Sequence, residues 1–539
     1  MVRPLVAFHI TPESLSPWIT CPYPSNWCPF KLNQSKNLRI IAFKYILLQM
    51  ALLVASLATL ALAYITYQLY TFQRLRHISG PALASWTSFW LVYAQLTGRI
   101  HIILHELVSQ HGPVARIGPN WVVCGDPSEI RRIWGARSPW TRAWWYRGMR
   151  IDPYRDSSFS TRDDALHNAI RSKLVPGYSG KEVDNLHELV QDQVQSLVRL
   201  LDKHVAEGGG ARTIDMAQKI QYFALDTISS LAFDDPFGFM ESDEDKFRYI
   251  ETTGNTVYIL VATALIPGVI SLMQSPYLQW IAPSVKDMAG IGDVIKTAER
   301  VVAERYGTNA KLKRDMLGSF VKHGFSQKDA ETEALIQIIA GSETTATAIQ
   351  ATILHIITSP HAYARLQHEI DTAEREGRIS TPVTNAEAQS LTYLQAVILE
   401  GLRVFPPAAA LYPKVCDTDE ILCGVSVPAG TNVAWSPWTI MRNADIFGAD
   451  ADLFRPERWL GAGKTKLMEQ TVMMAFAAGS RWECLGKNIA QLELNLVFVE
   501  LFRHFEFTLV DPANPWKSFN AGMFSQSNLN IALTRRSAA

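Results

Sequence analysis

A single cysteine, Cys484, lies in the segment FAAGSRWECLGKN (476–488), between a Gly/Ser/Arg turn and a second glycine. The next residues, IAQLELNLVFVELFRHF, are predicted to form a helix. A thiolate at a helix N-terminus is stabilised by the helix dipole and by free N–H groups. One thiolate suits the axial position of a haem iron, whereas zinc and iron–sulfur sites need several ligands. The alternative interpretation is an inert core thiol, the common fate of a lone cysteine.

A second unusual segment, AGSETT (340–345), interrupts an apolar helix predicted over 327–358. Ser326 and Asp329 form the capping box that opens this helix. In its middle, Glu343 and Thr344 stand beside other mediocre helix formers, and threonine hydroxyls can bond to carbonyls one turn earlier and open the helix. The alternative interpretation is a solvated helix face.

A third set combines one carboxylate with two guanidinium groups. Glu400 and Arg403 lie three residues apart on one face of a helix in LTYLQAVILEGLRVFPP. Alone, such a pair is usually a surface ion pair that stabilises little. Arg458, in the proline-bounded segment FRPERW (454–459), is a candidate third member, and the three predict a buried cluster.

The elements that must position these residues are mostly helices. Helical periodicity dominates 181–405, and short strand-like runs appear at 113–125 and 421–436. The regular alternation of strands and helices that a doubly wound sheet requires is absent. The sequence therefore predicts a mainly α fold with small β-sheets.

The N-terminal region contains 26 consecutive uncharged residues, YILLQMALLVASLATLALAYITYQLY (45–70). That length spans a hydrocarbon layer of about 30 Å, so we predict a transmembrane anchor rather than a core helix or a cleaved signal peptide. The predicted organisation is an N-terminal extension (1–44), the anchor (45–70), a hinge (71–80) and one catalytic domain (81–539).

The orientation of this anchor is open from the charges alone. Lys31, Lys36, Arg39 and Lys44 precede the span, which by the positive-inside rule places the N-terminus in the cytosol. A chain starting at Met50 would face the other way. The extension is therefore either lumenal or a start-site artefact; if lumenal, Asn33 in Asn-Gln-Ser is the expected glycosylation site.

Overall composition restricts the class of partner and the compartment. The 539 residues include 51 Lys+Arg and 51 Asp+Glu and are 48% hydrophobic, which gives no indication of a nucleic-acid partner. Six cysteines lack the paired spacing of a zinc site or the density of a disulfide scaffold. The main domain therefore suits a reducing compartment.

Taken in order, AGSETT, EGLR, FRPERW and FAAGSRWECLG resemble the motifs of the cytochrome P-450 haem-thiolate monooxygenases. The segments HGPVARIGPNWV (111–122) and CLGKNIAQLEL (484–494) are similar to fungal microsomal members such as pisatin demethylase. The resemblance implies the cytochrome P-450 fold around one buried haem b. It also implies a single-pass anchor in the endoplasmic reticulum membrane with the catalytic domain in the cytosol.

The resemblance also implies roles for individual residues. Cys484 is the implied iron ligand, with Phe476 packed near it, and Glu400, Arg403 and Arg458 form a structural cluster. Glu343 and Thr344 match an acid–alcohol pair that delivers protons to iron-bound dioxygen. The residues implied to bind the haem propionates are His167, Arg171, Lys414 and Arg481.

The sequence departs from the family pattern around the cysteine. Phe476 stands eight residues before Cys484 where seven is usual, as if Ser480 were inserted, and this shifts Arg481. We predict that the loop absorbs the extra residue at Gly479, because glycine adopts backbone angles closed to other residues. Lys414 stands where the family often has arginine, so it supplies charge without a bidentate fork.

The leading hypothesis is a monooxygenase that hydroxylates, epoxidises or otherwise oxidises an apolar small molecule of secondary metabolism. Electrons would come from NADPH through NADPH–cytochrome P-450 reductase, with cytochrome b5 as a further donor. A haem-thiolate isomerase or lyase that does not use O₂, and a non-catalytic haem-binding protein, are the alternatives. The segments expected to line the substrate pocket are apolar and aromatic: 140–149, 257–273, 408–412 and 521–524.

Overall fold

The computed structural model describes residues 30–275, 291–308, 310–311, 313–520 and 522–536. Side chains are described from residue 41 onward, except at 255, 256, 267, 273, 291 and 462. The chain divides into two compact units, Met1–Tyr70 and Thr71–Ala539. Most of the predicted N-terminal extension, and the side chain of Asn33, lie outside the described residues.

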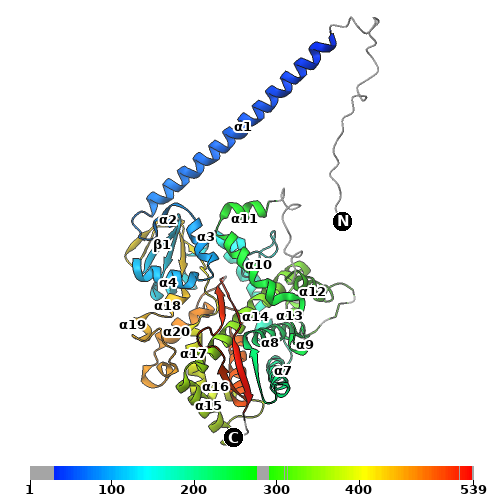
Figure 1. Ribbon diagram of the computed structural model, residues 1–539, viewed down its shortest axis with the longest axis vertical. Helices are drawn as coiled ribbons and strands as arrows, with labels where there is room; N and C mark the ends of the chain where they lie inside the picture. Colours follow the sequence, from blue (N-terminus) through cyan, green and yellow to red (C-terminus); the bar gives the residue numbers. More distant parts are fainter. Residues whose placement is uncertain (1–29, 276–290, 309, 312, 521, 537–539) are drawn as a thin grey trace. The chain divides into compact units, whose positions relative to one another are not determined.

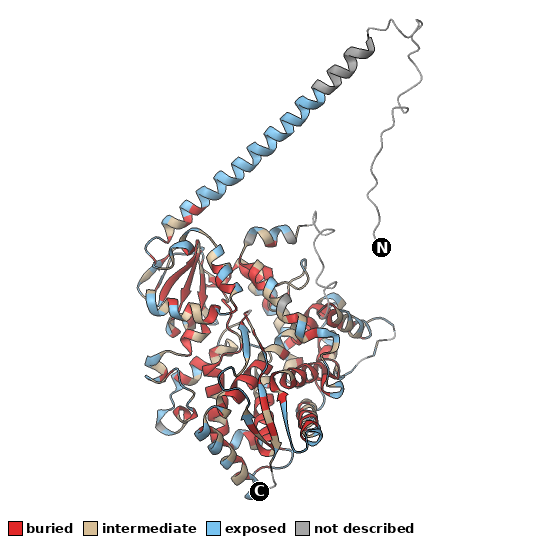
Figure 2. Ribbon diagram, in the orientation of Figure 1, coloured by how far each residue is buried: buried red, intermediate tan, exposed pale blue. Residues whose placement is uncertain are grey.

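The membrane-anchor prediction falls on helix α1 (Phe30–Arg74). Its segment Ile41–Arg74 is 34 residues long with a mean hydropathy of 2.3, long and apolar enough to cross a membrane. None of the side chains in its most apolar window is buried in the protein, as the pale blue ribbon of Figure 2 shows. The helix continues four residues past the predicted end of the anchor, because 71–74 contain no helix breaker.

The second unit is mainly helical (Figure 1). Its helices are α2 (Ala82–Trp86), α3 (Phe89–Leu96), α4 (Ile100–His111), α5 (Pro127–Trp134), α6 (Asp164–Tyr178), α7 (Leu186–Glu207), α8 (Met216–Phe233), α9 (Phe239–Ser242), α10 (Tyr249–Ala264), α11 (Pro267–Met273), α12 (Ile291–Ala303), α13 (Met316–Lys322), α14 (Gln327–Ile357), α15 (Pro360–Arg375), α16 (Asn385–Ser390), α17 (Thr392–Val404), α18 (Pro437–Ile440), α19 (Ala444–Phe447), α20 (Lys466–Met473) and α21 (Lys487–His504). Short 3₁₀ turns include η1 (Trp144–Met149), η4 (Pro456–Trp459) and η6 (Met474–Phe476).

The strands form small sheets, and the five-stranded one has the order β1-β2-β8-β5-β3. The strands are β1 (Val114–Gly118), β2 (Trp121–Cys124), β3 (Thr141–Arg142), β4 (Ala211–Asp215), β5 (Lys414–Val415), β6 (Glu420–Leu422), β7 (Val425–Val427), β8 (Asn432–Trp435), β9 (Phe505–Leu509), β10 (Lys517–Asn520), β11 (Phe524–Ser527) and β12 (Asn530–Arg535). The predicted mainly α fold with small β-sheets is confirmed.

Helix α14 is the central element of the core. It follows the predicted 327–358 to within one residue, and the Ser326 side chain accepts the Asp329 N–H at its start. It packs against α8, α12, α17 and α21, and most of its residues are buried. Because neighbours cover it on several sides, its polar residues lie inside the protein.

The strands that the sequence patterns did not predict form through long-range pairing. The predicted strand regions 113–125 and 421–436 contain β1, β2, β7 and β8, and β6 overlaps the second region except for its first residue. Strand β4, however, lies within the region read as helical and pairs antiparallel with β12 near the C-terminus. Similarly, β3 and β5 are two-residue strands that exist because Arg142 pairs with Lys414 in register. Such pairings leave no local periodicity in the sequence.

Candidate active site

The thiol of Cys484 lies at the N-terminus of α21, as the sequence predicts. Backbone N–H groups of Gly486 and Lys487 donate to its sulfur. The residue is accessible, yet the surrounding protein removes enough water to raise the pKa of the thiol, an effect that the two N–H donors and the charge of Arg171 oppose. An accessible sulfur with a fixed direction and stabilising donors suits a metal ligand.

The loop before the cysteine closes on itself across the extra residue. The Cys484 N–H donates to the Phe476 carbonyl over 2.8 Å, so the two ends of the loop meet. Gly479 has a φ of 80°, and Ser480 Oγ donates to the Ala477 carbonyl at 2.7 Å. No atom lies within 4 Å of a Cβ built at Gly479, so glycine is favoured there by its positive φ alone and not by a lack of space. The turn at Gly479 is as predicted, and Ala477, with a φ of 50°, shares it.

Glu400, Arg403 and Arg458 come together in the core, with at most 3% of each residue exposed. Glu400 Oε2 accepts from Arg403 Nε at 2.8 Å, and Glu400 Oε1 accepts from Arg458 Nε at 2.9 Å. Trp459 Nε1 and the Arg455 N–H donate to the same carboxylate. The cluster joins α17 to η4, and both elements precede the thiol loop in the sequence. It contributes to the scaffold rather than to a reacting surface.

Glu343 and Thr344 lie in the middle of α14, and their polar groups bond to different partners. Gln221 Nε2, on α8, donates to Glu343 Oε1 at 3.0 Å, while Thr344 Oγ1 donates to the Ala340 carbonyl at 2.8 Å. Burial raises the pKa of Glu343 to about 8, and the Gln221 hydrogen bond offsets only part of this. Burial therefore favours the protonated form of this carboxyl group near neutral pH.

Three basic residues converge on Trp482, next to the thiol loop. Lys414 Nζ is 2.7 Å and Arg481 Cζ 4.9 Å from the centroid of the Trp482 ring, and the His167 ring is 6.2 Å away. Lys414 is fully buried, and its Nζ, like His167 Nδ1, has no hydrogen-bond partner in the described structure. Burial and the charge of Arg142 lower the pKa of Lys414 to about 5.

Arg142 belongs to this group but was missed by the sequence analysis. It lies on β3 opposite Lys414 on β5, and is buried, with Nε unpaired. Its Nη1 donates to the carbonyls of Ser158 and Thr161. The sequence analysis assigned the whole segment 140–149 to the lining of the substrate pocket. The sequence signal that could have singled out Arg142 is a basic residue within a run of aromatic residues.

The other two predicted cationic ligands are already bonded elsewhere. Arg171 donates to the Glu483 carbonyl, one residue before the cysteine, so it braces the thiol loop. Arg481 donates to the carboxylate of Asp164 and to the Ser138 carbonyl. In the described structure Arg481 is thus paired with the first residue of α6 through its terminal nitrogens, while its Nε is buried without a hydrogen-bond partner. Its predicted role as a propionate ligand stays a prediction.

These residues fit a haem. A buried cation is strongly destabilising unless an anion pairs with it. Asp164, the acidic neighbour of Lys414, is already paired with Arg481. Lys414, Arg142 and His167 thus offer unsatisfied donors beside an accessible thiol, and the two propionates of a haem are anions of the right kind. Lys414 and Arg142 would hold the propionates and Cys484 the iron.

The four segments predicted to line the substrate pocket meet in space. Tyr146, Val261 and Ala410 belong to one hydrophobic cluster. A Cβ added to Gly522 would lie 3.3 Å from Ala410 and 3.6 Å from Val261, which brings in the fourth segment. The structure therefore brings these widely separated parts of the chain into one buried apolar cluster.

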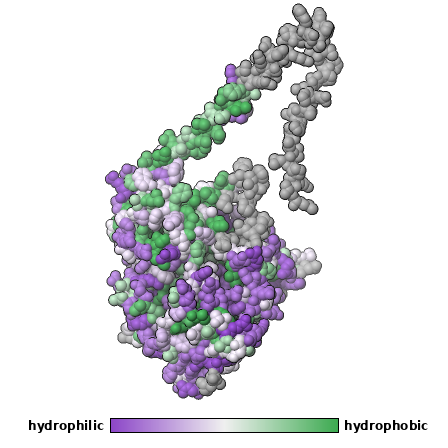
Figure 3. Space-filling model, viewed as in Figure 1, coloured by the Kyte–Doolittle hydropathy of each residue, from purple (hydrophilic) through white to green (hydrophobic). Residues whose placement is uncertain are grey.

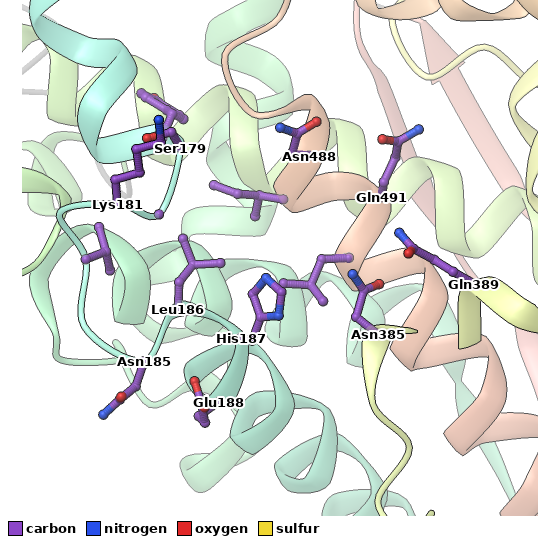
Figure 4. A pocket seen from close by; sticks show the side chains of 15 residues that line it. Ser179, Lys181, Asn185, Leu186, His187, Glu188, Asn385, Gln389, Asn488 and Gln491 are labelled. Atoms are coloured by element: carbon purple, nitrogen blue, oxygen red, sulfur yellow. The ribbon is translucent and has the colours of Figure 1, made fainter. Parts of the chain in front are cut away.

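A surface cleft of about 640 Å³ lies elsewhere, between the start of α7 and the first turns of α21 (Figure 4). Residues with amide side chains from three helical regions line it. None of the predicted site residues lines this cleft, so it is separate from the candidate active site. The amide-bearing residues are Asn185, Asn385, Gln389, Asn488 and Gln491.

Comparison with known proteins decides between a haem site and an unrelated thiol. The family model described as Cytochrome P450 matches residues 80–535. This chain belongs to the cytochrome P450 family. It is 39% identical over 498 residues to cytochrome P450 monooxygenase ABA1 of Pyricularia oryzae, covering 90% of this chain and 96% of that protein. It is also 35% identical to cytochrome P450 monooxygenase aba1 of Botryotinia fuckeliana, over 85% of this chain and 92% of the relative.

A third relative, cytochrome P450 monooxygenase cicH of Emericella nidulans, is 30% identical over 89% of this chain and 99% of its own length. Full-length similarity to several fungal monooxygenases makes this cytochrome P450 an oxidoreductase of the monooxygenase type. Membership implies a haem cofactor, electrons from a redox partner and a small-molecule substrate.

Proposed function

We propose that this cytochrome P450 inserts one oxygen atom from O₂ into an apolar small molecule of secondary metabolism, by hydroxylation, epoxidation or successive oxidations. The observation that carries the proposal is the combination of an accessible thiol beside the start of α21 with the Glu343 carboxyl group in the middle of α14, hydrogen-bonded to Gln221. The haem, when bound through Cys484, supplies the activation of dioxygen.

The side chains of α14 support a proton-delivery role. O₂ activation consumes protons, and the neutral Glu343 carboxyl can give one up when its proton is drawn away. The Gln221 amide orients Glu343, and re-forms the same hydrogen bond when the carboxylate is charged. Thr344 Oγ1, bonded to the Ala340 carbonyl, can accept and pass on a proton by rotating its hydroxyl.

The cationic group supports haem b as the cofactor. Lys414 and Arg142 present buried donors with no anionic partner among the described residues, and haem b carries two carboxylates. The redox partner we propose is NADPH–cytochrome P-450 reductase, with cytochrome b5 as a second donor. We propose that the apolar cluster of Tyr146, Val261 and Ala410 borders the substrate, which suits a bulky apolar molecule such as a terpenoid or a polyketide.

We place the protein on the endoplasmic reticulum membrane with its second unit in the cytosol. The apolar length of α1 supports a single span, and exposed aromatic residues suit a membrane–water interface: Trp86, Phe89 and Tyr93. Figure 3 shows apolar side chains along α1 and around α3. A lumenal N-terminus predicts glycosylation of Asn33, visible as a glycosidase-sensitive mass shift that Asn33→Gln removes.

Two measurements test the function. The reduced carbon monoxide complex of the purified protein should show the absorption of thiolate ligation, and Cys484→Ala should lose it. A thiolate spectrum that survives Cys484→Ala would rule out the assigned ligand. Substrate oxidation that requires NADPH, reductase and O₂ supports a monooxygenase, whereas turnover of a hydroperoxide without them would support the isomerase or lyase alternative.

Thr344→Ala tests the relay separately. The variant should retain haem and substrate binding but release hydrogen peroxide instead of product. Glu493→Gln is a matched control. Glu493 is another buried acid beside α14, and burial raises its pKa to about 8. It is bonded to Thr345 and is not part of the proposed relay. Unchanged coupling of NADPH use to product in Thr344→Ala would contradict the assigned role.

A further inference from the structure

A buried carboxylate near the start of α14 has no part in the chemistry described above. Glu333 is only 4% exposed, and both of its carboxylate oxygens accept hydrogen bonds from Ser158. The Ser158 N–H donates to Oε1 at 2.6 Å, and Ser158 Oγ donates to Oε2 at 2.7 Å. One residue of the segment between η1 and α6 is thus held at two points by one side chain of α14.

The carbonyl of Ser158 is bonded in turn to Arg142. Arg142 Nη1 donates to the carbonyls of Ser158 and Thr161, each at 3.0 Å. The guanidinium group also lies over the Tyr146 ring, 4.8 Å from its centroid, and its Nε is buried without a hydrogen-bond partner in the described structure. Ser158 therefore connects the Glu333 carboxylate to the guanidinium group that we assign to a haem propionate.

The residues around Ser158 form a compact turn. The Ser157 N–H donates to Ser160 Oγ at 2.9 Å, and the Ser160 N–H donates to Ser157 Oγ at 3.1 Å. The Thr161 N–H closes the turn on the Ser157 carbonyl at 3.0 Å. Because the turn is bonded internally, a side chain that fixes Ser158 also fixes the Thr161 carbonyl, the second acceptor of Arg142.

We propose that Glu333 is a positioning residue for the cofactor, which holds Ser158 and thereby orients the Arg142 guanidinium group for a haem propionate. The two bonds from Ser158 to Glu333 and the two bonds from Arg142 to the turn carry this inference. It deepens the proposed function and rests on it, because that function assigns Arg142 to the haem.

The chemistry of the acceptor explains why this position needs a carboxylate. A carboxylate accepts the N–H and the O–H donor on separate oxygens, whereas an amide has one oxygen and turns an NH₂ group toward the other donor. Burial raises the pKa of Glu333 to about 7, and the two Ser158 donors oppose that shift. Glu333→Gln therefore breaks one of the two bonds while conserving the size of the side chain.

The same helix offers a matched control two residues earlier. Glu331 is 5% exposed, but its carboxylate accepts from Lys328 Nζ at 2.6 Å and from Gln327 Nε2 at 3.0 Å, both within α14. Glu331→Gln thus removes a buried carboxylate of α14 whose hydrogen bonds do not reach the turn.

A second control concerns an exposed link between the same two parts of the chain. Arg155, three residues before Ser158, donates to Asp329 on α14 at 2.7 Å, and both side chains are more than a third exposed. Arg155→Gln removes this link and leaves Glu333 in place.

The test measures haem loss and reduction potential on the haem-loaded full chain in detergent, with excess apomyoglobin as the haem acceptor. Glu333→Gln should lose haem about tenfold faster than wild type, while its reduced carbon monoxide complex keeps the thiolate spectrum. Its reduction potential should fall, because a displaced Arg142 no longer offsets the charge of a propionate. Removing a carboxylate charge would by itself raise the potential, so the sign separates the two effects.

The control variants separate positioning from a general loss of stability. Glu331→Gln and Arg155→Gln should keep the wild-type potential and rate of haem loss. Ser158→Ala keeps the N–H bond to Glu333 and should shift both quantities in the same direction by a smaller amount, which provides a test if Glu333→Gln does not fold. Ser158→Thr keeps both donors and should behave as wild type.

Arg142→Met shows whether the effect of Glu333 passes through Arg142. If it does, Arg142→Met combined with Glu333→Gln should lose haem no faster than Arg142→Met alone. Additive losses, or wild-type haem loss and potential in both Glu333→Gln and Ser158→Ala, would overturn the inference and leave the monooxygenase function standing. A wild-type protein without a haem-thiolate spectrum would overturn the proposed function and this inference together.

Discussion

Lys414 and Arg142 lie directly opposite each other on the paired strands β5 and β3, both buried, and the Lys414 ammonium has no hydrogen-bond partner in the described structure. Burial removes the hydration of the Lys414 ammonium and the charge of Arg142 repels it, and together these effects lower the pKa of Lys414 to about 5. An anion bound between them removes both effects. The pair is therefore a site whose stability depends on its ligand.

Replacing Lys414 with methionine should separate stability from cofactor retention. In the haem-free protein, the unfolded lysine keeps its proton up to its ordinary pKa of 10.5 while the folded one loses it above about pH 5. Wild-type stability should thus rise with pH across that window, and Lys414→Met should abolish the rise. In the loaded protein, the variant should lose haem roughly tenfold to a hundredfold faster.

Two controls make the Lys414 measurement specific. Lys414→Arg should retain the haem, because a guanidinium can bind the same anion in a bidentate fashion. Lys296→Met changes a lysine whose side chain is 61% exposed and should alter neither the pH slope nor haem loss. Haem retention in Lys414→Met equal to wild type would remove Lys414 from the propionate site.

Glu400→Gln should destabilise the protein by about 3–5 kcal/mol, because it leaves the buried guanidinium groups of Arg403 and Arg458 without their counter-charge. Glu251→Gln is the matched control: its carboxylate pairs with Arg248 three residues away but both side chains are more than half exposed. That change should stay within about 0.5 kcal/mol. Urea unfolding of both variants measures the difference.

Glu343→Gln should change how stability depends on pH. The folded Glu343 keeps its proton up to about pH 8, whereas the unfolded residue releases it near its ordinary pKa of 4.5. The contribution of the raised Glu343 pKa to folding stability is fully present below pH 4.5 and is lost as the pH rises toward 8. The variant should therefore gain stability relative to wild type between pH 5 and 9 in denaturant unfolding. A constant difference across that range would show that Glu343 is ionised in the folded protein.

Deleting Ser480 should preserve thiolate ligation. The deletion removes the Ser480 bonds to Ala477 and Trp482, but the N–H groups of Gly486 and Lys487 that direct the sulfur lie on the other side of Cys484. The reduced carbon monoxide spectrum should keep its position, with some loss of thermal stability. Complete loss of haem would show instead that the longer loop is a required geometry.

The sequence alone determined the features that depend on local chemistry. Hydrophobic periodicity and the Ser326 cap predicted α14 almost to the residue, and the Gly-bearing loop before an apolar run predicted a thiol at the N-terminus of α21. The three-residue spacing of Glu400 and Arg403 predicted their shared helix face. Each of these relations lies within one element, so propensity and spacing suffice.

Tertiary structure alone decided which distant residues meet. Arg142 faces Lys414 only because two-residue strands pair, and Gln221 reaches Glu343 only because α8 packs along α14. The motif placed Arg481 near the haem, but only the packing of α6 shows that Asp164 is its ion-pair partner. Such contacts arise from the packing of whole elements. Sequence periodicity does not indicate which side chains find a partner in that packing and which do not.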